Sequence, residues 1–174
     1  MNDVELAVRL LRATPTHERR DEAQLRRWAE IALAVGDELA DAENDKENDE
    51  EVPVVERDGG ITGGELLLAE YRKGTVTVYR DSLARLAKLA AGKGWPVSRD
   101  ALRKAAVAHE VAHHRIDLRE LNRRLGHTAA RLGPFRVRGH VAGAGEIVAH
   151  RFAHRRSGLG ISPLLLSTAL SRGD

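Results

Sequence analysis

The sequence predicts an α+β fold that is mainly helical, in which N-terminal helices precede a small β-hairpin and two helices that carry chemistry. Helical periodicity runs through residues 3–39 and 82–117. Residues 65–80 show the alternation and β-branched content of a hairpin. The second helical region contains the sequence HEVAH at residues 109–113, which has the HExxH pattern of a metal-binding helix.

Composition restricts the chemistry that this chain can use. Its 174 residues suffice for one domain with an appendage, and 42% apolar content with only 3% aromatics predicts a core of aliphatic side chains. The chain has no cysteine, so disulfides, thiolate ligands and cysteine nucleophiles are excluded, and a metal must bind to His, Asp or Glu. No signal core or membrane-length apolar stretch is present, so we expect a cytoplasmic protein without membrane contact.

The N-terminal part is predicted to be helical and acidic. We expect helices over residues 3–13 and 17–39, and the apolar stripe of the second is formed by Leu25, Trp28, Ala29, Ala32 and Val35. Residues 37–51 hold nine acidic residues and one lysine, which favours a helix that frays into a disordered linker. We therefore divide the chain into a helical segment, 1–52, and a catalytic domain, 53–174.

Charge is distributed unevenly between the two parts. Residues 1–60 carry 8 basic and 17 acidic side chains, whereas residues 61–174 carry 20 basic and 9 acidic side chains. The two parts either attract each other or present two separate solvated surfaces.

The second part begins with the hairpin and continues in helices. Its arms are predicted at Glu65–Tyr71 and Thr75–Arg80, joined by a turn at residues 72–74. Asp81 or Ser82 is expected to cap a helix that ends at Gly92 or Gly94, and Ser98 to cap the HExxH helix. Residues 118–125 can continue as helix, 126–145 indicate a loop or short turns, 145–156 a strong helix, and 162–174 a short apolar helix.

The HExxH helix can present two imidazoles to one ion. His109 and His113 lie one turn apart, about 40° around the helix axis and about 6 Å along it. Glu110, on the neighbouring face, can act on water beside that ion as a general base. The flanking residues are small and apolar, which is typical of a buried active-site helix rather than of a surface helix with incidental histidines.

Glu146 is the preferred third ligand because Ile147 and Val148 beside it predict burial, and a buried carboxylate is costly without a cation. Two alternatives stay open. Glu146 can instead interact with the helix dipole, and His150 can be the third ligand.

The HEVAH motif at 109–113 and the segment GEIVAH at 145–150 resemble the pattern of gluzincin metallopeptidases, and over residues 61–157 the order of elements is similar to the minigluzincins. The resemblance implies a zincin-like core in which His109, His113 and Glu146 bind one zinc ion and Glu110 is the catalytic base. It also implies that the strand formed by Thr75, Val76, Thr77, Val78 and Tyr79 is the edge strand for a peptide substrate, and that a terminal segment occupies the cleft as in a zymogen.

Four features depart from this pattern or stay outside it. Arg115 stands where such helices usually carry an apolar residue, and His150 stands where a small or acidic residue is common. No tyrosine follows Tyr79, so the usual tyrosine oxyanion stabiliser is absent from the second half; His140, His150 or His154 could substitute, but core or surface roles are favoured for each of them. The arginines of residues 131–138 favour a solvated loop over a nucleic-acid site.

The sequence therefore predicts a zinc metallopeptidase, a hydrolase that acts on peptide or protein substrates. The alternative is a regulatory or interaction protein of the same fold that keeps the metal and has lost turnover. A homodimer through the N-terminal helices or the apolar tail remains open. Of the two terminal segments, the N-terminal helices are the favoured cover of the cleft.

Overall fold

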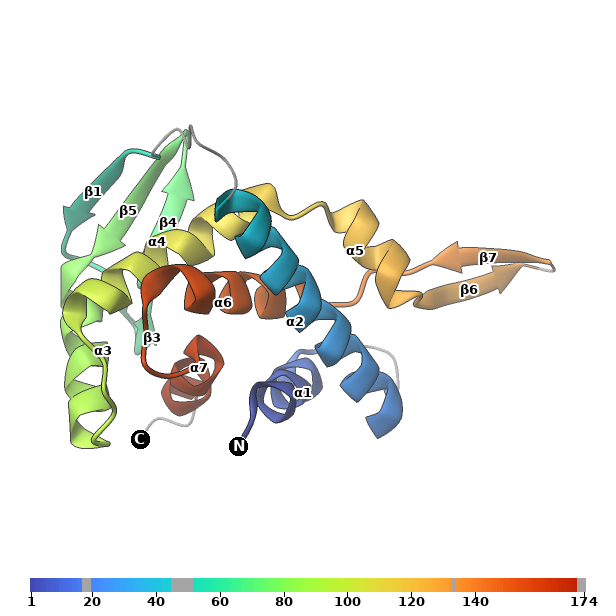
Figure 1. The fold of residues 1–174 in the computed structure, drawn as a ribbon, viewed down its shortest axis with the longest axis horizontal. Coiled ribbons are helices and arrows are strands. Elements are labelled where there is room, and N and C mark those ends of the chain that lie inside the picture. The colour runs from blue at the N-terminus through green and yellow to red at the C-terminus, as the bar shows by residue number, and fades with distance from the viewer. Residues whose placement is uncertain (17–19, 45–51, 133, 172–174) are drawn as a thin grey trace.

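The computed structural model describes residues 1–16, 20–44, 52–132 and 134–171, which form a mainly helical α+β fold with seven helices and a small mixed sheet. Helices α4 (Arg99–Arg115) and α6 (Ala144–Ser157) lie side by side in the middle (Figure 1). The sheet and α3 (Arg80–Gly92) pack on α4, and α2 (Glu22–Asn44) crosses α6. None of the described helices combines the length and the apolar character needed to cross a membrane.

The N-terminal helices belong to the same hydrophobic core as the later helices. Helix α1 (Asp3–Ala13) starts with a capping box between Asn2 and Glu5. Its apolar face and that of α2 pack against α5 (Leu118–Leu125), α6 and α7 (Pro163–Ser171). The largest fully buried side chains of this cluster are Leu6, Leu11, Trp28, Leu121, Leu125, Val141, Ile147 and Val148.

Helix α2 is longer at its acidic end than the sequence predicts. The predicted end of this helix at residue 39 was wrong, because the helix continues to Asn44. The acidic side chains there face a basic side of α6: Asp37 pairs with Arg151 at 2.7 Å, and Asp41 with Arg155 at 2.7 Å. These ion pairs offset the repulsion that the acidic run would otherwise cause. Residues 17–19 and the predicted linker residues 45–51 lie outside the described residues.

The sheet has the strand order β1-β5-β4. Strand β5 (Thr75–Tyr79) pairs in parallel with β1 (Val54–Arg57) and in antiparallel with β4 (Ala69–Arg72). A two-residue turn joins β4 to β5, in which Lys73 and Gly74 have φ of 49° and 81°, as a primed hairpin turn requires. The predicted hairpin is confirmed at β4–β5. The start of its first arm, however, belongs to a separate pair, β2 (Ile61–Thr62) and β3 (Glu65–Leu66).

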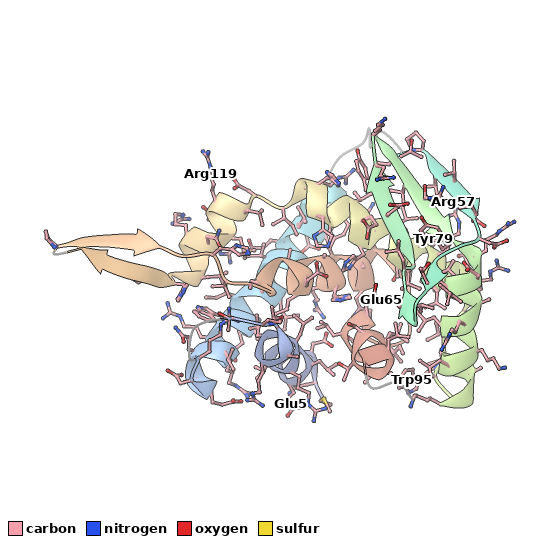
Figure 2. All side chains as sticks on the ribbon, turned by 180° about the vertical axis from the view of Figure 1, so that it is seen from behind. Glu5, Arg57, Glu65, Tyr79, Trp95 and Arg119 are labelled. Atoms are coloured by element: carbon pink, nitrogen blue, oxygen red, sulfur yellow. The ribbon has the colours of Figure 1, made fainter. Side chains whose placement is uncertain are left out.

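Because β5 is central, the prediction that Thr75, Val76, Thr77, Val78 and Tyr79 form the edge strand was wrong. Its second side is occupied by β1, a strand that the sequence analysis missed because it is only four residues long and directly follows Pro53. The edge that lies against α4 is β4. Arg57 on β1 donates a hydrogen bond to the hydroxyl of Tyr79 on β5 at 2.8 Å, and this hydroxyl donates one to Glu70 on β4 at 2.5 Å, so the three strands are linked. Figure 2 labels Arg57 and Tyr79 on the sheet.

Helix α3 begins directly after β5, with Tyr79 as its N-cap and no side-chain cap. The predicted cap was therefore wrong: Asp81 instead accepts hydrogen bonds from the backbone N–H groups of Gly59 and Gly60. For α4 the predicted cap is confirmed, since Ser98 Oγ accepts the N–H of Ala101 at 3.0 Å.

Residues 126–145, predicted as loop, contain an antiparallel hairpin of β6 (Thr128–Leu132) and β7 (Phe135–Arg138). The prediction was wrong because glycines and a proline flank and interrupt short strands with few apolar residues, which hides their alternation.

Candidate metal centre

Two histidines on α4 bring their ring nitrogens together. The Nε2 atoms of His109 and His113 lie 3.1 Å apart, and the ring centroids are 4.8 Å apart. The helical spacing places both rings on one side of α4, as the sequence predicts. The two rings therefore approach each other closely enough for one ion to contact both.

Helix α6 brings a carboxylate to the same point. Glu146 is in the first turn of α6, after Gly143, which takes a φ of 89°. Glu146 Oε2 lies 3.3 Å from His109 Nε2, and Glu146 Oε1 lies 3.1 Å from His113 Nε2. The helices approach closely because alanines line their contact: Ala105, Ala106, Ala112, Ala149 and Ala153 are all buried.

These three donors are spaced as ligands of a tetrahedral ion are spaced. Metal–ligand bonds of 2.0–2.1 Å at tetrahedral angles put neighbouring ligand atoms about 3.3 Å apart. The distances among His109, His113 and Glu146 are 3.1 to 3.3 Å. Two imidazoles and a carboxylate are also a donor set that suits zinc. The residues present therefore fit such an ion.

The carboxylate is less buried than the sequence analysis expected. The side chain of Glu146 is 48% exposed, so the prediction of its burial was wrong. Ile147 and Val148 do face the core, but Glu146 points from the other side of α6 towards α4. Hydrogen bonds from His109 and His113 hold the pKa of Glu146 well below its usual range, and the bond to Glu146 raises the pKa of His113.

His150 adds a fourth donor, one turn after Glu146. Candidate ligand atoms of His109, Glu146 and His150 all lie within 4.8 Å of one another, so this group could hold one metal ion across α4 and α6. The ring centroids of His109 and His150 are 4.5 Å apart. Burial, and then the proximity of His109, lower the pKa of His150 to about 3, which keeps its ring neutral and able to bind a metal or donate one N–H.

Glu110 lies beside the two histidines and contacts the sheet. Its Oε2 atom accepts the backbone N–H of Tyr71 on β4 at 3.2 Å. This contact places the Glu110 carboxylate between the face of α4 that carries His109 and His113 and the open edge of β4. The sequence analysis did not identify Tyr71, and no local signal could have done so, because the contact joins two segments 39 residues apart.

An apolar cavity of about 270 Å³ adjoins the centre. His109, Glu110, Glu146 and His150 form its polar side. Its apolar wall comes from α3, α4, α6, α7, the β3–β4 segment and the connection between α6 and α7, and includes Leu66, Leu68, Leu86, Leu102, Leu159, Leu166 and Leu170. Helices α1 and α2 supply none of the described lining residues, so the prediction that the N-terminal helices cover the cleft was wrong. They dock on the other side of α6, where its arginines face Asp3 and Asp37.

The remaining histidines among the described residues lie away from this cavity. His140 is exposed after β7, and His154 is half-buried on α6 but does not line the cavity. His127 packs edge-on against Trp28, and His114 stacks on Tyr71 at 3.8 Å between ring centroids. Of the three histidines considered as oxyanion stabilisers, only His150 is placed beside the candidate ligands.

Comparison of the chain with protein-family models, with curated proteins and with solved structures finds no match. The geometry of the centre and the chemistry of its side chains are therefore what indicates its function.

Proposed function

We propose that this chain is a zinc-dependent metallopeptidase with a gluzincin-like catalytic centre. The observation that carries the proposal is the convergence of His109, His113 and Glu146 at 3.1 to 3.3 Å, with Glu110 beside them. The resemblance of HEVAH and GEIVAH to gluzincin motifs supports it.

In this proposal His109, His113 and Glu146 hold one zinc ion. When bound, zinc supplies Lewis acidity, which polarises a carbonyl group and acidifies water. Three protein ligands would leave a fourth position for water or substrate, as a catalytic zinc site requires.

Glu110 is the general base in the proposed reaction. It takes a proton from the attacking water and transfers it to the leaving amine, so that the peptide bond is broken without a covalent enzyme intermediate. Its bond to the N–H of Tyr71 orients one carboxylate oxygen and leaves the other oxygen available. The neutral ring of His150, at the buried side of the centre, is the candidate donor to the developing oxyanion.

The substrate is proposed to lie along β4. Among the described residues β4 pairs with a strand only on its β5 side, so its other side, where the N–H of Tyr71 reaches Glu110, would pair with an extended peptide. One apolar side chain of that peptide would enter the cavity of about 270 Å³ between α4 and α7. The proposed substrate is therefore a flexible peptide or protein segment with a large aliphatic or aromatic residue next to the cleaved bond.

A second function is favoured by one specific observation. His150 places a fourth donor within reach of the same point, and four protein ligands are typical of structural zinc sites that have no position left for water. In this alternative the chain is a regulatory or interaction protein that binds zinc without turnover.

The deciding experiment measures zinc content and hydrolysis together. Purified full-length protein should contain about one equivalent of zinc and cleave a fluorescent casein substrate. A chelator should abolish cleavage and added zinc should restore it. His109→Ala should lose both properties, whereas the matched control His140→Ala, which changes an exposed histidine, should keep both. Stoichiometric zinc without any cleavage would favour the alternative, and absence of zinc binding would contradict both functions.

A further inference from the structure

His114 and Glu110 lie one turn apart on α4 and contact the same residue of the sheet. The backbone N–H of Tyr71 on β4 donates a hydrogen bond to Glu110 Oε2 at 3.2 Å. The ring of His114 stacks on the ring of Tyr71, with 3.8 Å between the ring centroids and 35° between the ring planes. Residues four apart on a helix share one face, so a single face of α4 holds Tyr71 both by its backbone and by its ring.

The ring of Tyr71 is the larger of the two side chains that β4 directs towards α4. Side chains alternate along a strand, and of the four residues of β4 only Ala69 and Tyr71 belong to the apolar cluster between the sheet and α4. Among the described residues β4 pairs with a strand only on its β5 side. The position of its other edge relative to α4 therefore depends on how Tyr71 is held.

Burial does not account for the position of His114. His114 is exposed, whereas Tyr71 is half-buried. Consecutive residues on a helix point about 100° apart, and the group that could hold a metal consists of His109, Glu146 and His150. What His114 contributes to this part of the molecule is therefore its stack on Tyr71.

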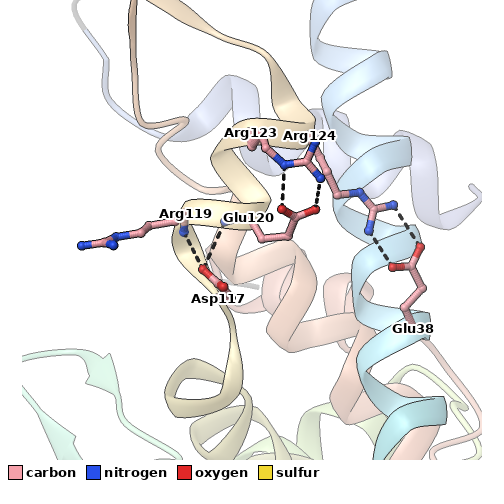
Figure 3. Close-up of polar contacts among 6 residues, drawn as sticks. All are labelled: Glu38, Asp117, Arg119, Glu120, Arg123 and Arg124. Carbon is pink, nitrogen blue, oxygen red and sulfur yellow. Dashed lines mark hydrogen bonds and ion pairs between the residues drawn. The ribbon is translucent and has the colours of Figure 1, made fainter.

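The last turn of α4, which carries His114, is held by the chain that follows it. Directly after this turn Asp117 caps α5 by accepting two backbone N–H groups, at 2.9 and 3.1 Å (Figure 3). Near the other end of α5, Arg124 binds Glu38 of α2 through both nitrogens, at 2.6 and 2.9 Å (Figure 3). Helix ends commonly fray, but these contacts fix the end of α4 to α5 and, through α5, to α2. His114 is thus presented to Tyr71 from a fixed support.

We propose that His114 is a positioning residue for Glu110. Its ring fixes Tyr71, so that the Tyr71 N–H stays directed at Glu110 Oε2 and the edge of β4 stays at a constant distance from α4. The inference rests on the peptidase function proposed above, in which Glu110 is the base. A general base has to stay within hydrogen-bond reach of the water that it deprotonates, and a misplacement of about 1 Å can cost about 100-fold in rate. The stack therefore acts on the rate of the chemical step.

The first measurement is hydrogen exchange of backbone amides, followed by NMR on full-length, metal-free protein with chelator present. In His114→Ala the Tyr71 amide should exchange about fivefold or more faster than in the wild type, because its N–H is less often bonded to Glu110. His114→Phe keeps a ring that can stack, and should return this exchange rate to within about twofold of the wild type. The amide of Val76, which donates to the Pro53 carbonyl oxygen, should exchange equally in all variants and so report that the sheet is intact.

The second measurement is hydrolysis of the fluorescent casein substrate by zinc-loaded protein. His114→Ala should lower kcat by about tenfold and change KM by less than about twofold. A ring that served only to keep the substrate edge in place would raise KM and leave kcat unchanged. His114→Phe should restore kcat. The control His140→Ala, which changes another exposed histidine, should behave as the wild type does in both measurements.

Three outcomes would overturn the inference. They are unchanged Tyr71 exchange in His114→Ala, a loss of kcat that His114→Phe does not restore, and an effect of His114→Ala on KM alone. Failure of the proposed function would be distinguishable, because zinc-loaded wild type would then cleave nothing, while exchange in the metal-free protein would still show whether His114 keeps Tyr71 on Glu110. Circular dichroism of His114→Ala should match the wild type, because the replaced residue is exposed.

Discussion

The carboxylate of Glu110 on α4 and the backbone N–H of Tyr71 on β4 are joined by a hydrogen bond of 3.2 Å. This bond couples the helix that carries the candidate metal ligands His109 and His113 to the open edge of the sheet. A peptide that pairs with β4 would therefore lie next to the candidate base, and the base would already be oriented before the peptide arrives.

Replacing Glu110 by glutamine is expected to separate metal binding from hydrolysis. The amide oxygen can still accept the N–H of Tyr71, so the local geometry should persist, but glutamine cannot take up a proton from water. Zinc content should stay near the wild-type value, while kcat falls by about 10²- to 10⁴-fold. The control is Glu30→Gln on the exposed face of α2, which should cleave normally. Unchanged cleavage by Glu110→Gln would exclude Glu110 as the base.

The choice between Glu146 and His150 as third ligand can be decided by affinity. Glu146 lies 3.1 and 3.3 Å from the two histidines of α4, so its removal should weaken zinc binding by more than about 100-fold. His150→Ala should weaken it by about tenfold or less, because in our proposal His150 lies outside the ligand set. Competition with a chromogenic chelator measures both values. The reverse order of effects would assign the ligand role to His150.

Widening the apolar cavity should change substrate preference. Leu170 of α7 lines the cavity, whereas Leu165 of the same helix packs against the other core cluster. Leu170→Ala should therefore raise kcat/KM for a peptide with tryptophan beside the cleaved bond, relative to one with leucine, by about three- to tenfold. Leu165→Ala should leave this ratio unchanged. Equal ratios in both variants would show that the cavity does not hold a substrate side chain.

Gly36 in α2 should tolerate no side chain. A Cβ atom at Gly36 would lie 2.6 Å from Arg151 Cβ and 2.9 Å from the Val148 carbonyl oxygen, both on α6. The gain in helix propensity, about 1 kcal/mol, is smaller than the cost of separating two packed helices, so Gly36→Ala should lower the free energy of unfolding by about 1–3 kcal/mol. Gly92→Ala at the end of α3 meets no atom within 4 Å. In urea denaturation this control, Gly92→Ala, should have a free energy of unfolding equal to or higher than that of the wild type.

The hydrogen bond from Tyr79 to Glu70 should make the free energy of unfolding decrease at acid pH. The hydrogen bond from the Tyr79 hydroxyl, followed by the charges of Arg72 and Arg57, lowers the pKa of Glu70 in the folded chain. The unfolded chain then binds more protons, so this contribution is present above the ordinary pKa of Glu and is lost as pH falls through the lowered value.

We expect wild-type protein, measured with chelator, to lose about 0.5–1 kcal/mol more stability between pH 6 and pH 3 than Glu70→Gln does. The exposed residue Glu65 provides the control, since Glu65→Gln should follow the wild type. Parallel pH profiles of wild type and Glu70→Gln would contradict the proposed contribution of Glu70.

The sequence alone determined where the helices of the second part lie and which candidate metal ligands they carry. Helical periodicity and the Ser98 cap are local signals, so α4 and the one-turn spacing of His109 and His113 could be read directly from the residues. The absence of cysteine limited any metal site to histidine and carboxylate ligands. The sequence signal for the β4–β5 turn, at Lys73 and Gly74, was equally local.

Only the tertiary structure decided which of these elements meet. Strand β1 pairs with β5 across more than twenty residues, and Asp37 pairs with Arg151 across 114 residues. A short stretch of sequence therefore predicts neither the central position of β5 nor the packing of α2 on α6. The same holds for Glu146 and His150. Both were candidates by residue type, but their approach to His109 follows from buried alanines that let α4 and α6 pack closely. Packing of distant segments depends on the summed burial and charge of whole faces, and a periodic pattern reports only which face a residue occupies.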